Sequence, residues 1–335
     1  MNILIVGLGS IGIRHLINFH TLNPRANFFA LRQNLAPRMT KHPNFNQLLP
    51  NYTTLNQYQD AKAIKPDIVI VSNPSALHCD TALFFHRETD AIILLEKPCA
   101  TSLESLAQFG QIPDPHRVLV AQQLRFHPLT TLIKKINDSS VLGSLYRFKF
   151  VHAEHIDLWH PWENFRASYA VRQDLGGGSF LTQNHGTDLM FYLFGAPDHY
   201  VTMTGNGSHL GIDCDEMFIS SLRYDQPRCN LLGTIECDYL GRPPRMTAEF
   251  NFSRGSVKLD FRSGEIEALI GRKNGQKKIG RSISFERNTQ YLDMARAVYD
   301  CVGSASSTPK DHRLVDIREA IVTLERGLLS ITNII

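Results

Sequence analysis

The sequence lacks the features of exported, membrane-bound and nucleic-acid-binding proteins. Its opening stretch, MNILIVGLGS, has no basic segment of the kind that begins a signal peptide. No apolar run reaches the roughly 18 residues that a membrane helix needs. The net charge is only +3, and Lys and Arg form no run, which argues against a nucleic-acid partner. We therefore expect a cytoplasmic protein with no membrane and no nucleic-acid partner.

Paired cysteines and metal-binding motifs are missing as well. The six cysteines are scattered and neither CxxC nor HExxH occurs, which favours reduced thiols. His152, His155 and His160 lie close together in the sequence. On an extended strand, however, His152 and His155 point to opposite faces. We expect no metal site, and we interpret these histidines as surface or substrate-facing residues.

What the sequence does have is length and an alternating pattern. The chain has 335 residues, of which 43% are hydrophobic, enough for two domains. Continuous apolar runs alternate with helical patterns over the first 120 residues, which is typical of a doubly wound α/β domain whose parallel strands are buried on both faces. The predicted strands are 2–7, 27–32, 66–72, 90–97 and 117–123, and the predicted helices are 10–22, 54–64, 75–87 and 101–111, with Ser75 and Thr101 as N-caps of the last two.

The pattern changes after Arg125. A connecting helix is predicted first, and the segments beyond it are rich in strand-forming residues separated by turn residues, which indicates a largely antiparallel sheet. The predicted strands are 145–154, 199–206, 216–224, 229–240, 244–252 and 255–261, and the predicted helices are 179–194, 289–303 and 313–332.

A glycine-rich turn follows the first predicted strand. Gly7, Gly9 and Gly12 have the GxGxxG spacing between a strand and a helix, which is the context of a dinucleotide-binding Rossmann domain. Gly7 permits the tight turn, Gly9 lets a pyrophosphate approach the backbone, and Gly12 lets helix and strand pack closely. The phosphates meet the positive end of the helix, so Ser10 and Ile11 are expected cofactor contacts. A tight turn without a ligand is the alternative.

Arg32 lies twenty residues beyond Gly12, where the choice between the two nicotinamide cofactors is made. An acid there binds the ribose hydroxyls of NAD, whereas arginine suits the extra phosphate of NADP. We favour NADP over NAD. The alternative is a solvated charge at the end of a strand.

Glu96, Lys97 and Pro98 follow an apolar strand. Ligands of open α/β sheets bind outside the carboxyl ends of the strands, so Lys97 is expected to face the nicotinamide. The proline permits a cis peptide after Lys97. The alternative for Lys97 is an ion pair at the strand end.

Several spaced motifs together resemble one known family. GLGSIG, SNPSALH (72–78), EKP (96–98), LRFHP (124–128) and the glycine run that leads into His185-x-x-Asp188 have the order of the glucose–fructose oxidoreductase, inositol dehydrogenase and rhizopine-catabolism (Gfo/Idh/MocA) family. The resemblance covers almost the whole chain. It implies a Rossmann domain at 1–122 and, at 123–335, a second α/β domain for substrate binding and oligomerisation. It also implies a homodimer or homotetramer formed through the second sheet.

The resemblance further implies the activity and the site. Family members oxidise a sugar or cyclitol hydroxyl, or reduce the matching ketone, with NAD(P). The family's lysine falls on Lys97 and its catalytic histidine on His185. Many members carry an aspartate three or four residues before that histidine, where this chain has Leu181 and Thr182. The carboxylate is therefore missing, or is replaced by Thr182, Asn184 or Asp188. The resemblance implies further cofactor contacts from Asn73, Pro74, Ser75, His78, Glu96 and Gln123.

Trp159 and Trp162 are the two tryptophans of the chain, and they favour a wall on which a sugar ring stacks. Arg166 and Tyr169 add donors for a carboxylate or phosphate, and Arg125 is expected in the same cleft, as is His127. The stretch resembles a family branch associated with bacterial surface sugars. The alternative is that the tryptophans anchor the core or an interface.

We expect Lys97 and His185 to act together on the proton of the reacting hydroxyl. Two other functions remain open. One is an enzyme that uses bound NAD(P) transiently during an elimination or hydrolysis. The other is a sensor that binds nucleotide without catalysis, against which the presence of both Lys97 and His185 argues.

Overall fold

The structure, a computed structural model, describes residues 1–32, 49–110, 112–161, 164–225, 230–272, 275–303 and 311–332. The chain packs into two units. The first consists of Met1–Gln123, Pro161–Gly177 and Asn288–Leu324, and the second consists of Leu124–His160, Gly178–Arg287 and Glu325–Ile335. The division at residue 122 stays a prediction. The packing units differ from it because two later segments pack with the N-terminal residues.

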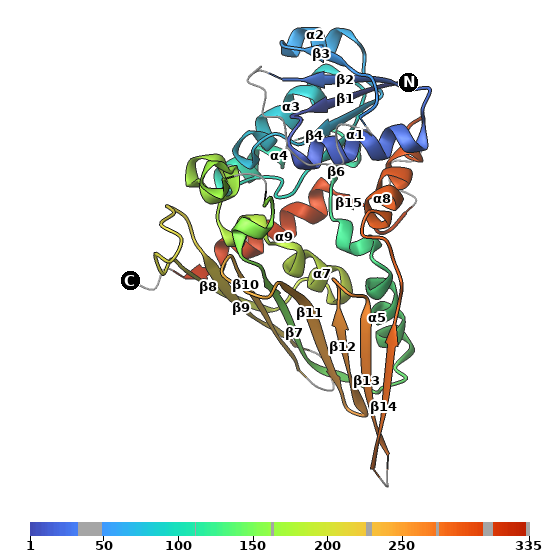
Figure 1. Cartoon of the computed structure of the whole chain (residues 1–335), viewed down its shortest axis with the longest axis vertical. Coiled ribbons are helices and arrows are strands. Elements are labelled where there is room, and N and C mark those ends of the chain that lie inside the picture. The colour runs from blue at the N-terminus through green and yellow to red at the C-terminus, as the bar shows by residue number, and fades with distance from the viewer. Residues whose placement is uncertain are drawn as a thin grey trace. The chain divides into compact units, whose positions relative to one another are not determined.

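The first unit contains a seven-stranded sheet, which confirms the predicted doubly wound domain (Figure 1). All neighbouring strands are parallel except the last pair, in which β15 runs antiparallel to β6. The apolar side chains of β1, β4 and β5 are buried, except for half-buried Ile92, as expected for strands covered on both faces. In spatial order the strands are β15 (Val315–Asp316), β6 (Val118–Val120), β5 (Ile92–Leu95), β4 (Ile68–Val71), β1 (Asn2–Val6), β2 (Asn27–Leu31) and β3 (Thr53–Leu55).

Helices flank this sheet. α1 packs against β1 and β4, and it also packs against α8, where Asn18 and Asn288 exchange side-chain hydrogen bonds and the Tyr299 hydroxyl donates to the Phe19 carbonyl. The helices are α1 (Ser10–Leu22), α2 (Tyr58–Ala63), α3 (His78–Glu88), α4 (Leu103–Phe109), α8 (Thr289–Tyr299) and α9 (Ile317–Leu329), the last of which begins in the first unit and ends in the second.

The second unit contains a nine-stranded sheet, and the prediction of a largely antiparallel sheet is confirmed. Two of its neighbouring pairs, β7 with β10 and β8 with β16, are parallel. In spatial order the strands are β14 (Gly275–Ser282), β13 (Glu265–Arg272), β12 (Gly255–Asp260), β11 (Arg245–Phe252), β7 (Leu145–Ala153), β10 (Leu231–Asp238), β9 (Met217–Tyr224), β8 (His199–Gly205) and β16 (Ile331–Thr332).

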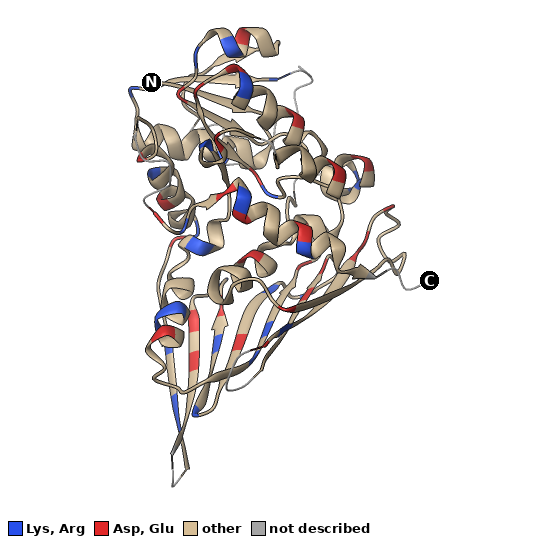
Figure 2. Cartoon of the chain, turned by 180° about the vertical axis from the view of Figure 1, so that it is seen from behind, with Lys and Arg blue, Asp and Glu red and all other residues tan. Residues whose placement is uncertain are grey.

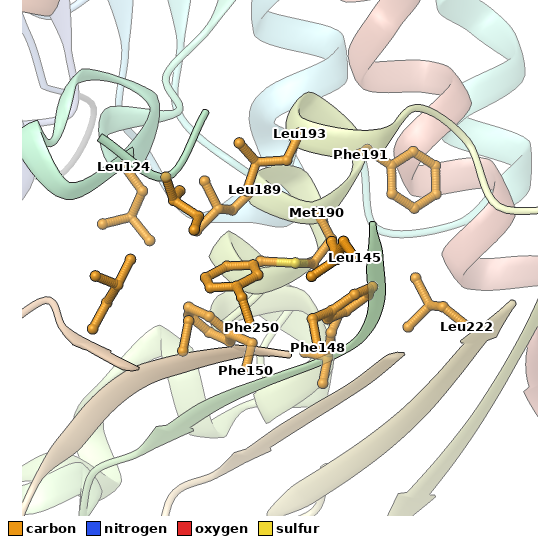
Figure 3. Close-up of a cluster of buried hydrophobic side chains, with 14 of the residues drawn as sticks. Leu124, Leu145, Phe148, Phe150, Leu189, Met190, Phe191, Leu193, Leu222 and Phe250 are labelled. Atoms are coloured by element: carbon orange, nitrogen blue, oxygen red, sulfur yellow. The ribbon is translucent and has the colours of Figure 1, made fainter. Parts of the chain in front are cut away.

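One face of this sheet forms a large apolar core with α5 (Pro128–Ser139) and α7 (His185–Phe194). Leu189 and Met190 of α7 lie over Phe148, Phe150 and Phe250 of the sheet (Figure 3). Charged residues of both signs are interspersed along the strands (Figure 2). Lys149 alternates with the buried Phe148 and Phe150 and so lies on the other face, where it pairs with Glu236 at 2.7 Å.

Some predicted elements are wrong in detail. The helix predicted over 54–64 is the strand β3 followed by the short helix α2. The helix predicted over 179–194 is two helices, α6 (Ser179–Thr182) and α7. Ser75 begins a 3-10 turn without capping it by its side chain, and Ser102 rather than Thr101 caps α4.

Two features are absent from the described residues. No described helix has both the length and the apolar character that crossing a membrane requires. No three His, Cys, Asp or Glu side chains of the described residues gather as metal ligands would.

Candidate active-site residues

Two glycines of the glycine-rich turn are required by close packing, and the third borders open space. Gly7 has φ of +91°, and a Cβ there would lie 2.7 Å from the Asn73 nitrogen. A Cβ on Gly12 would lie 2.1 Å from the Gly7 carbonyl oxygen. A Cβ on Gly9 would meet nothing within 4 Å among the described residues. The fold thus requires Gly7 and Gly12, whereas the open space beside Gly9 fits the approach of a pyrophosphate.

The N-terminus of α1 completes this anion site. Gly9 is its N-cap residue and makes no side-chain cap, and the first turn, which contains Ser10 and Ile11, carries no acidic side chain. The positive end of the helix dipole is therefore not neutralised by a carboxylate of that turn, which suits a dinucleotide phosphate. Arg32 is half-buried directly after β2, where its backbone nitrogen donates to Leu55.

The segment after β4 holds a buried histidine. His78 Nδ1 lies 2.7 Å from the Pro98 carbonyl oxygen, and Nε2 lies 2.9 Å from the Asn73 carbonyl oxygen. Burial lowers the pKa of His78, although both carbonyl contacts oppose that change. His78 thereby joins the segment Asn73–Ser75 to the EKP motif, while Pro74 precedes the 3-10 turn that Ser75 begins.

Asn73 offers a polar atom to a ligand. Its side-chain nitrogen donates to Thr81 Oγ1 at 2.9 Å. Its side-chain oxygen is buried and has no hydrogen-bond partner among the described residues. Because buried acceptors are nearly always satisfied in folded proteins, this oxygen fits a donor supplied by a bound cofactor.

Glu96 and Lys97 follow β5, and the Lys97–Pro98 peptide is cis, as the sequence suggested. Glu96 is buried, and its Oε1 lies 2.7 Å from Nε2 of the fully buried His15 on α1. Burial alone would raise the pKa of Glu96, but the His15 contact and nearby positive charges hold it below the ordinary value. Burial lowers the pKa of half-buried Lys97, and the Glu96 charge opposes that change. Lys97 therefore reaches its neutral, proton-accepting form at a lower pH than an exposed lysine does.

The segment Pro161–Gly177 packs within the first unit, beside the residues just described. A Cβ on Gly176 would lie 2.9 Å from Ser75 Cβ. Burial, together with the Glu96 charge, raises the pKa of Tyr169 to about 12, so its hydroxyl stays protonated and can donate. Arg166 is exposed, with its guanidinium 4.7 Å from the Phe165 ring centre. Gln123 is buried after β6, and Trp162 lies outside the described residues.

In the second unit, His185 is the first residue of α7 and is buried. Asn184 precedes it as the N-cap residue, and its buried side-chain oxygen has no hydrogen-bond partner among the described residues. Thr182 donates to the Gly178 carbonyl oxygen at 2.8 Å and contacts the Tyr239 hydroxyl. The His152 ring centre lies 6.4 Å from that of His185.

Arg125 and Asp188, both expected at the substrate, pair with each other. The guanidinium makes two hydrogen bonds to the carboxylate, at 2.9 and 2.6 Å, and stacks on Tyr192. His127 accepts a hydrogen bond from the Leu129 nitrogen and packs against Phe261 and Phe285, so it caps α5. Burial lowers the pKa of His127 to about 4. Substrate contacts by these residues stay predictions, and the structure adds a structural role for each.

Trp159 is half-buried and packs edge-on against Tyr239, with ring centres 5.4 Å apart. This contact is compatible with the core interpretation of the tryptophan, and stacking on a sugar stays a prediction. Sequence reasoning missed His15 and Glu154, which contact Glu96 and His152 respectively. It also missed Asp215, whose side chain accepts from Ser179 and the Phe180 nitrogen at the start of α6. No local motif marks these residues, and His15 and Asp215 act on partners distant in the sequence.

Comparison with known proteins agrees with this geometry. The model of the Gfo/Idh/MocA group, described as an oxidoreductase family with an NAD-binding Rossmann fold, matches residues 1–122. A search of curated proteins gives no match. Among solved structures, a levoglucosan dehydrogenase in complex with NADH is similar, with a TM-score of 0.80 and 15% identity over 98% of this chain and 95% of that one.

Two further solved structures are similar over 98% of this chain. The WlbA dehydrogenase from Bordetella pertussis, in complex with NADH and UDP-GlcNAcA, has a TM-score of 0.74, 19% identity and 94% of its own chain covered. A putative NADPH-dependent oxidoreductase from Desulfitobacterium hafniense has a TM-score of 0.77, 12% identity and 93% covered.

The fold and the glycine-rich turn define a Rossmann unit, suited to a dinucleotide, together with a second unit built on a largely antiparallel sheet. More narrowly, residues 1–122 match the NAD-binding Rossmann domain of the Gfo/Idh/MocA oxidoreductases, which supports the resemblance read from the sequence motifs.

Proposed function

We propose that the enzyme transfers hydride between a nicotinamide nucleotide and a hydroxyl or keto group of a sugar or sugar derivative. The observation that carries the proposal lies within the first unit. The open Gly9 turn lies at the carboxyl end of β1, and the Glu96–Lys97 pair lies at the carboxyl end of β5, the second strand along in the same parallel sheet. Open α/β sheets bind ligands at this edge. The bound nicotinamide supplies the redox chemistry, so the chain must bind, orient and move one proton.

Lys97 and His185 are the residues that we assign to this proton. The lowered pKa of Lys97 makes its amine available as a base, and an imidazole such as that of His185 also accepts a proton from a hydroxyl. In the reverse direction the protonated forms return it. His78 and His15 fix the EKP motif from two sides, through Pro98 and Glu96 respectively.

A sugar-like substrate is supported by the residues and by the similar structures. Levoglucosan dehydrogenase is known in complex with NADH and levoglucosan, and the WlbA dehydrogenase in complex with NADH and UDP-GlcNAcA. Trp159, Trp162, Arg166 and Tyr169 are proposed to hold the substrate, with the orphaned Asn184 oxygen accepting from a hydroxyl. We further propose a role in bacterial surface-carbohydrate metabolism, which the WlbA likeness supports.

The preferred cofactor is proposed to be NADP because of Arg32. Similar structures carry NADH in one case and are described as NADPH-dependent in another. The Arg32→Ala variant tests the proposal. Its affinity for NADPH should fall about tenfold or more while its affinity for NADH is retained. Equal losses for both nucleotides would leave NADP preference without support.

A homo-oligomer formed through the second sheet is part of the proposal. Val201, Met203, Ile219 and Leu232 are all more than 40% exposed, and they share the sheet face opposite the core. Apolar side chains gathered on one exposed face suit an interface between copies. Light scattering would show a dimer or tetramer that Ile219→Lys converts to smaller species.

Calorimetry with NADP(H) and NAD(H), followed by absorbance assays on sugars, amino sugars and nucleotide sugars, tests the activity. Tight binding with turnover that is lost in both Lys97→Ala and His185→Ala supports the proposal. Tight binding with a changed sugar but no net absorbance change indicates transient redox chemistry instead. Binding without any change to a sugar indicates a nucleotide sensor.

A further inference from the structure

His152 of β7 lies beside His185, with the two ring centres 6.4 Å apart and the ring planes inclined by 32°. Two features of the second unit bring them together. His152 is on the same strand face as Phe148 and Phe150, which is the face that α7 covers. Gly186 lets the first turn of α7 approach that face, because a Cβ there would lie 2.4 Å from the Phe150 ring.

Glu154 follows the last residue of β7 and lies two residues beyond His152. Its carboxylate lies 3.9 Å from His152 Nε2 and 3.0 Å from an Arg262 nitrogen. Its side chain is 12% exposed. Burial would raise the pKa of Glu154, but His152 and Arg262 hold it below the ordinary value. A partly buried negative charge therefore faces the side of His152 that carries Nε2.

Two other ionisable groups near the histidines, Asp188 and Cys237, are paired or stay neutral. Asp188 of α7 is paired with Arg125. Cys237 of β10 is the register partner of His152, and burial raises its pKa so far that it stays a neutral thiol. From β11, the register partner of His152 is Met246, which does not titrate. Glu154, with Arg262 behind it, is a carboxylate that contacts His152.

We propose that Glu154 holds the first proton taken up by this histidine pair on His152 and thereby keeps His185 neutral, the form that accepts a hydroxyl proton. Two positive charges at this separation repel strongly enough to separate the two protonation steps by about two pH units at the dielectric typical of protein sites. His152 and Glu154 are positioning residues that act on His185. The inference rests on the proposed role of His185.

Titration of histidine ring signals by NMR, in the full chain labelled at the histidine rings, tests the proposal without any substrate. The His185 signal is identified by its loss in His185→Gln. In His152→Gln the midpoint of the His185 titration should rise by one to two pH units, because the competing positive charge is gone. In Glu154→Gln it should rise by less, because His152 then protonates at lower pH. Glu236→Gln, which removes a carboxylate from the opposite face of the same sheet, should change nothing.

The pH profile of kcat/KM provides the second measurement. Its acid limb should move to higher pH in His152→Gln and Glu154→Gln and stay in place in Glu236→Gln. An unchanged or lowered His185 midpoint in both of the first two variants overturns the proposal. If no sugar is turned over, the NMR result still decides the coupling, while the proposed function fails by itself. Glu154→Gln is nearly isosteric and serves if His152→Gln does not fold.

Discussion

Arg125 and Asp188 form a bidentate ion pair in which both side chains are almost completely buried. Arg125 lies at the start of the second unit, and Asp188 lies in the first turn of α7, three residues after His185. The pair therefore fixes the end of the helix from which His185 projects. The sequence motifs predict substrate contacts for Arg125 and Asp188, and their ion pair also fixes the first turn of α7.

Removing Arg125 should destabilise the second unit strongly. Arg125→Met leaves the Asp188 carboxylate buried without its partner, and breaking such a pair costs about 3–5 kcal/mol. Lys278→Met, which breaks the exposed Lys278–Glu267 pair on the same sheet, should cost less than about 1 kcal/mol. Urea unfolding compares the two. Equal small losses would show that the buried pair contributes no more than the exposed one.

Substitutions of two glycines in the turn should affect different properties, one the stability of the fold and the other the affinity for nucleotide. Gly12→Ala should lower the melting temperature, because its Cβ would overlap the Gly7 carbonyl oxygen. Gly9→Ala should melt like the wild type but lose about tenfold or more in nucleotide affinity, since its Cβ would fill only the open space. Gly280→Ala is the matched control, with open space far along the chain, and should change neither property. Full nucleotide binding by Gly9→Ala would place the phosphates elsewhere.

Lys97→Met should lower kcat by about 10²–10⁴-fold while the melting temperature stays the same or rises. The substitution removes a half-buried amine whose charged form is disfavoured by desolvation, so little stability should be lost with it. Because burial lowers the pKa of Lys97, hydroxyl oxidation by the wild type should rise with pH through that lowered value, and the variant should lack this limb. Lys62→Met, at an exposed lysine of α2, is the control and should keep wild-type kinetics.

The Glu96–His15 contact should make stability depend on acid pH. The pKa of Glu96 is held below its ordinary value of 4.5, so the folded state binds this proton less readily than the unfolded state. The stabilisation is complete above the unfolded value and disappears as the pH falls through the lower, folded one. The difference in melting temperature between the wild type and Glu96→Gln should therefore shrink as the pH drops below about 4.5. A constant difference would show that Glu96 contributes nothing through its charge.

The sequence predicts the first unit well, because each of its signals is local. Buried parallel strands are continuous apolar runs, and GxGxxG needs only the turn that contains it. The range of α1 is predicted to the residue. The exposed strand β14, GQKKIGRS, was missed because it is almost entirely polar and shows little alternation. The break between α6 and α7 was missed because neither residue at the break, Gln183 or Asn184, is Gly or Pro.

The candidate site was predicted in part for the same reason. Glycines, EKP and His-x-x-Asp are readable as motifs, whereas the contacts that tune them join distant residues. His15 reaches Glu96 across 81 positions, and Arg125 reaches Asp188 across 63. His152 lies on β7 and Glu154 follows directly after it, and only the sheet topology reveals which strands lie beside them. Sequence motifs therefore identify the reactive groups, but not the residues that set the protonation state of those groups.

The antiparallel strand β15 and the helix α8 have a consequence for how the protein is made. Both belong to the first unit, yet they are synthesised after every strand of the second sheet except β16. A nascent chain that ends at residue 122 has β6 as an open sheet edge and exposes the face of α1 that α8 covers. The nucleotide-binding unit is therefore complete only when almost the entire chain has left the ribosome. A chain truncated before α8 lacks β15 and has an open sheet edge, which can pair with strands of other chains.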